Sequence, residues 1–233
     1  MQDGVSVDAV VKAYGSVQAL AGVSLRAAPG EVVAVVGPSA CGKSTLLELV
    51  CGLQAPDAGR VEAAPAALMP QRDGLFPWLD ALDNASLALR VAGTSRVAAR
   101  EQAAAHFATF GLAGFERARP FELSGGMRQR VAFVRTLLAG RPVLCLDEPF
   151  GALDALTRTQ LQEWLAAALE REPRTVLLIT HDVEEAALLA DRIVLLSPRP
   201  GRVVAELEVG LPRPRGRRDV AELRERALEV LGA

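Results

Sequence analysis

The residues best suited to chemistry form a glycine-rich loop. Residues 37–44 fit the phosphate-loop pattern G-x-x-x-x-G-K-[ST] at every defined position. Backbone N–H groups of such a loop, and of the first turn of the helix that follows it, can face a polyanion. Lys43 can then reach the β- and γ-phosphates, and the Ser44 hydroxyl can bind Mg²⁺. The sequence therefore predicts a site for a nucleoside triphosphate.

Two carboxylates follow a second apolar run. Residues 143–146 are Val-Leu-Cys-Leu, and Asp147 and Glu148 come directly after them. In open α/β sheets ligands bind beyond the carboxyl ends of the strands, so both acids are expected at the active edge. Neighbouring side chains on a strand point in opposite directions, which allows two roles. Asp147 can hold Mg²⁺ through water while Glu148 deprotonates an attacking water.

His181 follows a third apolar run, residues 175–180. We expect it at the same edge of the sheet, where it could hydrogen-bond a γ-phosphate or the attacking water. The alternative is a histidine that caps a helix beginning near Val183.

A second glycine-rich segment contains Ser124, Gly125 and Gly126. Ser124 is a good N-cap for an amphipathic helix predicted at 127–138, and the glycines allow close approach to an anion. An ordinary glycine-rich cap would explain the pattern equally well. A second phosphate-seeking loop is difficult to place inside one nucleotide site.

The elements that must position these groups alternate between strand and helix patterns. The run 32–36 is continuous, β-branched and apolar, as in a parallel strand buried on both faces, and the runs 143–147 and 175–180 are also predicted strands. Apolar residues after Thr45 have helical spacing, and residues 80–118 have a helical pattern that predicts a subdomain inserted into an α/β core. Further strands are predicted within 4–28 and at 191–196 and 202–209, and further helices at 157–170 and 220–231. Four arginines at 213–218 predict a solvated basic tail, or a contact for anionic lipid or nucleic acid.

Composition sets wide limits. The 233 residues suit one large α/β domain, and a formal net charge of -2 gives no electrostatic argument for a nucleic-acid partner. The three cysteines form no C-x-x-C pair, so reduced thiols in a cytosolic protein are expected. We find no signal peptide, and no apolar run reaches the roughly 18 residues that a membrane span needs.

Together the motifs resemble the ATP-binding cassette (ABC) ATPases over essentially the whole chain. The matching segments are Walker A at 37–44, the Q-loop glutamine Gln71, the family signature at 123–129, Walker B at 143–148, the D-loop at 151–154 and the switch histidine His181. The signature is the most specific, because other phosphate-loop enzymes lack it. The resemblance implies an α/β fold with a RecA-like core and mostly parallel sheet, an N-terminal antiparallel β subdomain and an inserted α-helical subdomain. It implies a single nucleotide-binding domain over 1–233, with the helical subdomain at about 76–125 and a C-terminal tail at about 212–233.

The resemblance also implies the cofactors ATP and Mg²⁺ and the roles of the site residues. The implied catalytic residues are Glu148, His181 and Gln71, and the implied Mg²⁺ contacts are Ser44, Gln71 and Asp147. From the residues alone, Tyr14 could stack on adenine or cap a hairpin; the family's adenine-stacking aromatic favours stacking. The implied ATP contacts are Tyr14, Gly37, Pro38, Ser39, Ala40, Cys41, Gly42, Lys43, Ser44, Thr45, Ser124, Gly125, Gly126, Gln129 and Asp154.

Family membership would explain why the chain has a second loop suited to an anion. In the family two cassettes pair head to tail, and each signature loop contacts the γ-phosphate held by the other chain. The resemblance thus implies an ATP-bound homodimer on the cytoplasmic face of the membrane, with permease subunits and, indirectly, a solute-binding protein as partners. No nucleic-acid partner is expected. We expect the permease contact near Phe76 and Trp78.

Three segments are similar to importers of the nitrate, sulfonate and taurine type: residues 75–79, Leu-Phe-Pro-Trp-Leu, and the proline–arginine stretches at 197–204 and 211–215. Pyrimidine-precursor importers are similar at these positions, and a non-transport ABC ATPase is a further alternative. Non-transport ABC ATPases usually carry a long coiled-coil insertion or two fused cassettes, which this chain lacks. A stand-alone phosphate-loop kinase or GTPase would leave the signature unexplained. Two departures from the family pattern are Ala40, where glycine is frequent, and a short segment at 60–70 whose strands are in doubt.

Overall fold

The computed structural model describes residues 4–232, which form two compact units. The first unit contains the residues up to 68, residues 142–148 and the residues from 162 onward. The second contains residues 69–141 and 149–161.

A six-stranded sheet forms the centre of the first unit, in the order β5-β6-β7-β3-β8-β9. β3 pairs in parallel with β7 and β8, β6 pairs in parallel with β7, and β9 is antiparallel to β8. All residues of β3, β6 and β7 are buried, which confirms the expectation from their continuous apolar runs. The bounds are β3 Val32–Val36, β5 Ala66–Met69, β6 Val143–Asp147, β7 Thr175–Thr180, β8 Arg192–Leu196 and β9 Val203–Glu208.

A smaller antiparallel sheet has the order β2-β1-β4. Its strands are β1 (Val5–Tyr14), β2 (Val17–Ala27) and β4 (Ala58–Ala63). Val5, Val7 and Val10 of β1 are buried, and polar residues alternate with apolar ones at 23–27 in β2, as expected for a sheet with one covered face.

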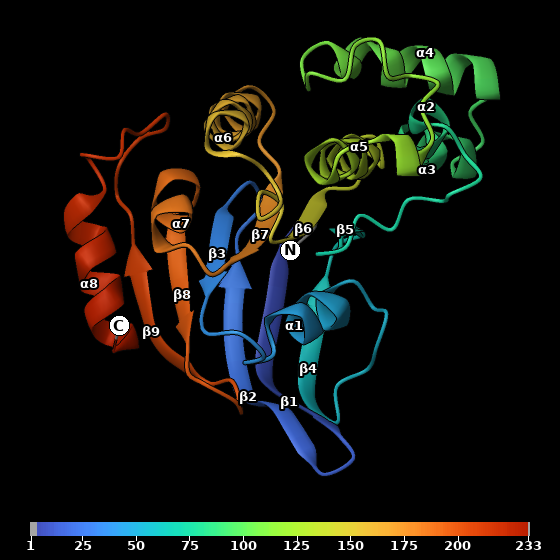
Figure 1. The fold of residues 1–233 in the computed structure, drawn as a ribbon. Helices are drawn as coiled ribbons and strands as arrows, with labels where there is room; N and C mark the ends of the chain where they lie inside the picture. Colours follow the sequence, from blue (N-terminus) through green and yellow to red (C-terminus); the bar gives the residue numbers. More distant parts are fainter. Residues whose placement is uncertain (1–3, 233) are drawn as a thin grey trace. The chain divides into compact units, whose positions relative to one another are not determined.

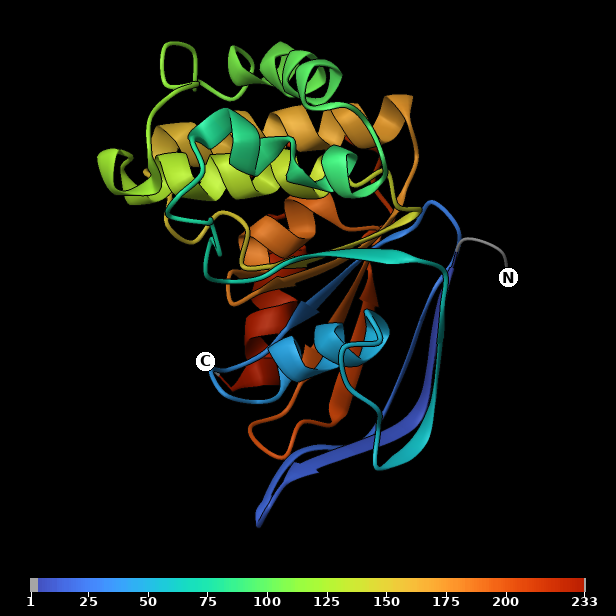
Figure 2. The ribbon, with the colours of Figure 1, turned by 90° about the vertical axis from the view of Figure 1, so that its right-hand side faces the viewer.

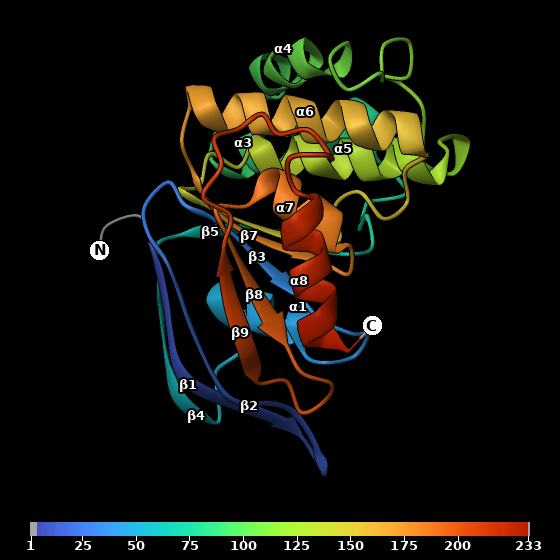
Figure 3. The same ribbon diagram turned by 90° about the vertical axis from the view of Figure 1, so that its left-hand side faces the viewer.

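Helices cover the main sheet of this unit on both faces. Helix α1 (Lys43–Val50) packs between the two sheets, and its leucines join one core with β3, β6 and β7 (Figure 1). Helices α7 (Val183–Leu189) and α8 (Ala221–Leu231) pack together on the opposite face of the main sheet (Figure 3).

The second unit is helical and is built around α5 (Gly125–Leu137), which contacts α2, α3 and α4 (Figure 2). The phenylalanines Phe107, Phe110, Phe133 and Phe150 are buried in it. The bounds of its other elements are α2 Ala81–Ala85, α3 Leu87–Val91, α4 Arg96–Phe107 and the 3₁₀ turn Pro120–Glu122. Helix α6 (Ala155–Arg171) begins in this unit and ends in the first.

The α/β class, the antiparallel N-terminal sheet and the mostly parallel main sheet are as expected. Three details differ from the sequence expectations. The helical pattern at 80–118 ends at Phe107, and turns follow it. The short segment 60–70 holds two strands, β4 in the small sheet and β5 at the edge of the large one, with Pro65 between them.

The third difference concerns the arginine run: the expectation of a solvated tail was wrong for Arg213 and Arg215, whereas Arg217 and Arg218 are exposed as expected. The side chains of Arg213 and Arg215 are only 12% and 1% exposed. Both guanidinium groups donate to main-chain carbonyls at the end of α7, so their charge is taken up by backbone oxygens instead of water.

Among residues 4–232, no helix is both long enough and apolar enough to cross a lipid bilayer.

Candidate nucleotide site

The phosphate loop connects β3 to α1, as its sequence predicts. The strand ends at Val36, and Lys43 is the first residue of the helix. Gly42 has φ +103°, and a Cβ there would lie 2.6 Å from Leu20 Cδ2 and 2.8 Å from the carbonyl oxygen of Ala19. Only glycine meets both conditions. Ala40 also has a positive φ, 60°, so the position where the family often has glycine does require the left-handed region.

Lys43 is a buried cation that the loop itself surrounds. Its residue exposure is 7%, and Nζ donates to the carbonyl oxygens of Gly37 at 2.7 Å and Pro38 at 2.8 Å. Among the described residues no carboxylate lies within ion-pair distance of Nζ. A buried ammonium held only by neutral acceptors favours the arrival of an anion, so the loop fits a polyphosphate.

Asp147 lies at the end of β6 and is 5% exposed. Burial raises the pKa of this carboxyl, and the negative charges of Glu148 and Glu48 add to the rise. A hydrogen bond with Ser44 and the charge of Lys43 oppose it. The structure thus brings together a hydroxyl and a carboxylate from two distant segments, both hard oxygen donors of the kind Mg²⁺ prefers.

Glu148 and His181 meet at the same edge. His181 Nδ1 lies 3.2 Å from Glu148 Oε1, and the histidine side chain is 64% exposed whereas that of Glu148 is 20% exposed. Glu148 has φ 48°, and its N–H donates to the carbonyl oxygen of Ile179 at 2.9 Å. A glutamate in this region of φ is strained, and such residues cluster at functional sites.

A cavity of about 440 Å³ lies beside the first residues of the loop. Gly37, Pro38, Ser39 and His181 line it, together with apolar side chains of β8, β9 and α8. The loop and His181, which the sequence predicts as one site, therefore face a common space within the first unit.

Gly201 supports the loop, and the sequence analysis did not identify it. It lies in the turn between β8 and β9, donates to the carbonyl oxygen of Ala19 at 2.9 Å and accepts from the N–H of Ala21 at 3.0 Å. A Cβ at Gly201 would lie 2.2 Å from the carbonyl oxygen of Cys41 in the phosphate loop. The available signal was the glycine of Pro200-Gly201, which is also what an ordinary turn would show.

Tyr14 ends β1 and is 46% exposed. Its hydroxyl donates to Gln54 Oε1 at 2.7 Å, and Lys12 Nζ lies 5.8 Å from the ring centroid. The ring is therefore fixed at its hydroxyl end while much of its surface stays open, a state compatible with a stacking partner.

Thr45 lies in α1, and the other remaining predicted residues belong to the helical unit. Ser124 caps α5 as expected, with Oγ accepting from the N–H of Met127 at 3.2 Å. Gly126 approaches Leu153 and Ala152 of the predicted D-loop, where a Cβ would lie 3.3 and 3.4 Å from them. Gln71, Ser124, Gly125 and Asp154 are exposed, but Gln129 is 4% exposed on the inner side of α5.

Comparison with known proteins decides the family. The family description "ABC transporter" matches residues 20–151 of this chain. The chain belongs to the ABC transporter family. It is an ABC ATPase, because the matched region holds the phosphate loop, the signature segment and the Asp147–Glu148 pair.

Sequence relatives agree with this assignment. An ATP-binding protein of Brucella abortus (strain 2308) is 44% identical over 224 residues, 92% of this chain and 86% of the relative. The taurine import ATP-binding protein TauB of Yersinia pestis is 45% identical over 205 residues, 84% of this chain and 80% of the relative. TauB of Chromobacterium violaceum is 46% identical over 198 residues, 81% of this chain and 76% of the relative.

Solved structures give the same fold. The bacterial ABC transporter cassette MJ0796, described as dimeric, matches with a TM-score of 0.82 at 30% identity, over 91% of this chain and 99% of the other. The same cassette in a post-hydrolysis state bound to ADP and Pi matches equally well.

Proposed function

We propose that this ABC ATPase is the motor subunit of an importer, in which two copies close on ATP and pass the motion to membrane permease subunits. The observation that carries the proposal is the edge of the main sheet. There Lys43 and Ser44, from the phosphate loop, lie with Asp147 on one side, and the Glu148–His181 pair lies at the ends of the neighbouring strands.

The binding roles follow from the donor set. Lys43 exchanges its carbonyl contacts for the β- and γ-phosphates, and the N-terminus of α1 faces them. Ser44 and Asp147 would hold Mg²⁺, and Gln71 is a further candidate ligand. The metal would supply neutralisation of the phosphate charge. Tyr14 stacks on the adenine.

Hydrolysis is assigned to Glu148 and His181. Glu148 accepts a proton from the attacking water, and the contact from His181 Nδ1 at 3.2 Å fixes the orientation of that carboxylate. The signature segment of the second copy completes the site, since Ser124 and Gly125 are exposed at the N-terminus of α5. The second copy also contributes Gly126, Gln129 and Asp154 to the site. Gln129 is buried, so it acts indirectly, through the structure of α5.

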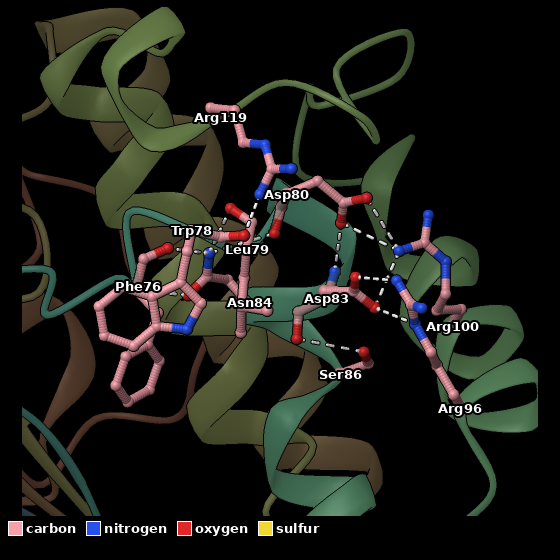
Figure 4. Close-up of polar contacts among 10 residues, drawn as sticks. All are labelled: Phe76, Trp78, Leu79, Asp80, Asp83, Asn84, Ser86, Arg96, Arg100 and Arg119. Atoms are coloured by element: carbon pink, nitrogen blue, oxygen red, sulfur yellow. Dashed lines mark hydrogen bonds and ion pairs between the residues drawn. The ribbon is translucent and has the colours of Figure 1, made fainter.

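A permease contact is proposed at Phe76 and Trp78. The two rings lie 5.1 Å apart, and Trp78 is 67% exposed. Figure 4 shows the two rings beside a group of polar side chains. Exposed aromatic anchors of this kind suit a helix-in-groove contact, where one residue can carry about 2 kcal/mol or more.

Asn84 holds this loop in place. It is fully buried, and its Oδ1 accepts from the N–H of Phe76 at 2.8 Å. Its Nδ2 lies within hydrogen-bonding distance of the carbonyl oxygens of Phe76 (3.1 Å), Leu79 (3.2 Å) and Asp80 (3.1 Å) (Figure 4). Arg119 donates to the carbonyl oxygen of Trp78. An exposed aromatic pair on a rigid backbone loses little entropy on binding.

The transported solute is proposed from the named relatives. Two of them are taurine import proteins, so a small sulfonate of the taurine type is the expected solute. The chain would then act at the cytoplasmic face of the membrane, with a solute-binding protein as an indirect partner.

The test of the motor function is Glu148→Gln in the purified full chain. The variant keeps the shape of the side chain but loses the base, so ATP turnover should fall roughly 10²- to 10⁴-fold. With hydrolysis blocked, ATP and Mg²⁺ should convert the variant from monomer to dimer in sedimentation. Glu163→Gln, at an exposed position of α6, is the matched control and should behave as wild type. Turnover near the wild-type rate in Glu148→Gln would remove Glu148 from the role of base.

A further inference from the structure

Helix α7 is held at both ends. It has seven residues, too few to be stable alone, and it begins two residues after His181. Asp182 caps its N-terminus, with Oδ1 accepting from the N–H groups of Glu184 at 2.9 Å and Glu185 at 3.2 Å. Its C-terminus receives donors from a distant part of the chain, the segment Leu211-Pro-Arg-Pro-Arg215.

Arg215 makes most of that contact. Its Nη1 donates to the carbonyl oxygens of Ala187 at 2.9 Å and Ala190 at 2.5 Å, and its Nε and Nη2 donate to Leu211. These carbonyls include the unsatisfied acceptors that every helix leaves at its C-terminus. A cation at that end also complements the helix dipole.

Arg213 and Arg217 extend the contact. Arg213 Nη1 donates to the carbonyl oxygen of Leu189 at 2.8 Å and pairs with Asp191 at 2.9 Å. Arg217 Nε lies 3.0 Å from the carboxylate of Glu184 in the first turn of α7. Three arginines of one short segment thus bind the same short helix at its two ends.

Such burial is costly for a guanidinium. Desolvation lowers the pKa of Arg215, the charge of Arg213 lowers it further, and Asp191, 3.7 Å away, opposes the change. A solvated tail would avoid this desolvation cost. The hydrogen bonds from the arginines to the end of α7 must therefore offset it.

We propose that Arg213 and Arg215 are positioning residues for ATP hydrolysis: by capping α7 they fix the segment 181–183 and hold His181 against Glu148. The inference rests on the proposed role of His181. It assigns a function to the proline–arginine segment, which the nucleotide site itself does not use.

The test is Arg215→Lys in the full chain. Lysine keeps the charge, but its ammonium cannot reproduce the planar fork that reaches three carbonyls. We expect kcat for ATP to fall roughly 10- to 100-fold, the scale of a catalytic group displaced by about 1 Å. KM should change little, because Lys43, Ser44 and Asp147 do not contact the arginines. Arg218→Lys, at an exposed neighbouring position, is the control and should keep wild-type kcat.

A double-mutant cycle with His181→Ala separates this role from a purely structural one. If the arginine acts through His181, adding Arg215→Lys to His181→Ala should lower kcat no further. If the two substitutions lower kcat by independent factors that multiply in the double variant, or if Arg215→Lys leaves kcat unchanged, the inference is overturned while His181 keeps its role. A His181→Ala variant with wild-type kcat would overturn the role of His181 itself. If Arg215→Lys does not fold, Arg213→Lys replaces it in the same cycle.

Discussion

Replacing Gly201 by alanine tests whether the β8–β9 turn supports the phosphate loop. The new Cβ would lie 2.2 Å from the carbonyl oxygen of Cys41, whereas carbon–oxygen contacts normally lie at about 3.3–3.6 Å, so the turn and the loop must separate by roughly 1 Å. Overpacking of this kind costs about 1–3 kcal/mol in the free energy of unfolding. The functional cost should be larger, since a displacement of about 1 Å can lower activity on the order of 100-fold.

The assay is kcat/KM for ATP together with urea unfolding of the nucleotide-free chain. Arg202→Ala is the matched control, because Arg202 is exposed in the same turn and its backbone contacts with Ser197 are kept. We expect Gly201→Ala to lose ATP turnover at temperatures where it is still folded. A folded variant with wild-type kcat/KM would refute the assigned support of the loop by the turn.

Three further predictions concern strain, charge and the permease surface. Ala40→Gly should raise the free energy of unfolding by up to about 1 kcal/mol. Glycine relieves the cost of a left-handed alanine, about 1–2 kcal/mol, which exceeds the stabilisation of the unfolded chain by its added entropy, about 0.4–1 kcal/mol. In the same series of urea unfolding measurements, Ala40→Val should lower the free energy of unfolding. Burial raises the pKa of Asp147, so the folded chain binds more protons than the unfolded chain between the ordinary aspartate pKa and the raised one, and stability falls as pH rises through that window. Asp147→Asn should remove this fall and give a nucleotide-free chain that is more stable than wild type at pH 7 in thermal unfolding, yet unable to hydrolyse ATP; equal stability at pH 7 would contradict the argument. Trp78→Ala should no longer co-purify with the permease, at unchanged thermal stability. Asn84→Ala should lose both co-purification and thermal stability, at a cost of about 1–3 kcal/mol for each buried group left unpaired. Normal co-purification of Trp78→Ala would contradict the proposed permease contact.

The predictable parts of the fold and site are those encoded in short stretches of sequence. Residues 32–44 contain a buried strand, a glycine-rich turn and a helix start in direct succession, so the two elements and the loop between them follow from local pattern. The same holds for β6 with Asp147, and for Ser124 as the cap of α5. Ala40 stands where the family often has glycine, and the structure shows the physical consequence, an alanine with a φ of 60°.

The parts that could not be predicted depend on partners distant in the sequence. Arg215 has the composition signal of a solvated run, and nothing near it indicates that its donors meet carbonyls 25 and 28 residues earlier. Gly201 resembles any turn glycine until Cys41, 160 positions earlier, lies against it. The strands of 60–70 were in doubt because β4 and β5 are short and belong to different sheets, so no alternation runs through both.

The candidate nucleotide site combines several costs that one ligand would relieve together. Lys43 is buried against neutral carbonyls, the pKa of Asp147 is raised by burial, and Ala40 and Glu148 are held at positive φ. Among the described residues only Ala9 shares that backbone region without being glycine, so the strain is concentrated in the site. In the proposed site a polyphosphate would pair with Lys43 and its metal with Asp147, so that each buried charge would gain a partner of opposite sign. The stability of this chain should therefore rise more with ATP and Mg²⁺ together than with either alone, because each partner relieves a cost that the other leaves in place.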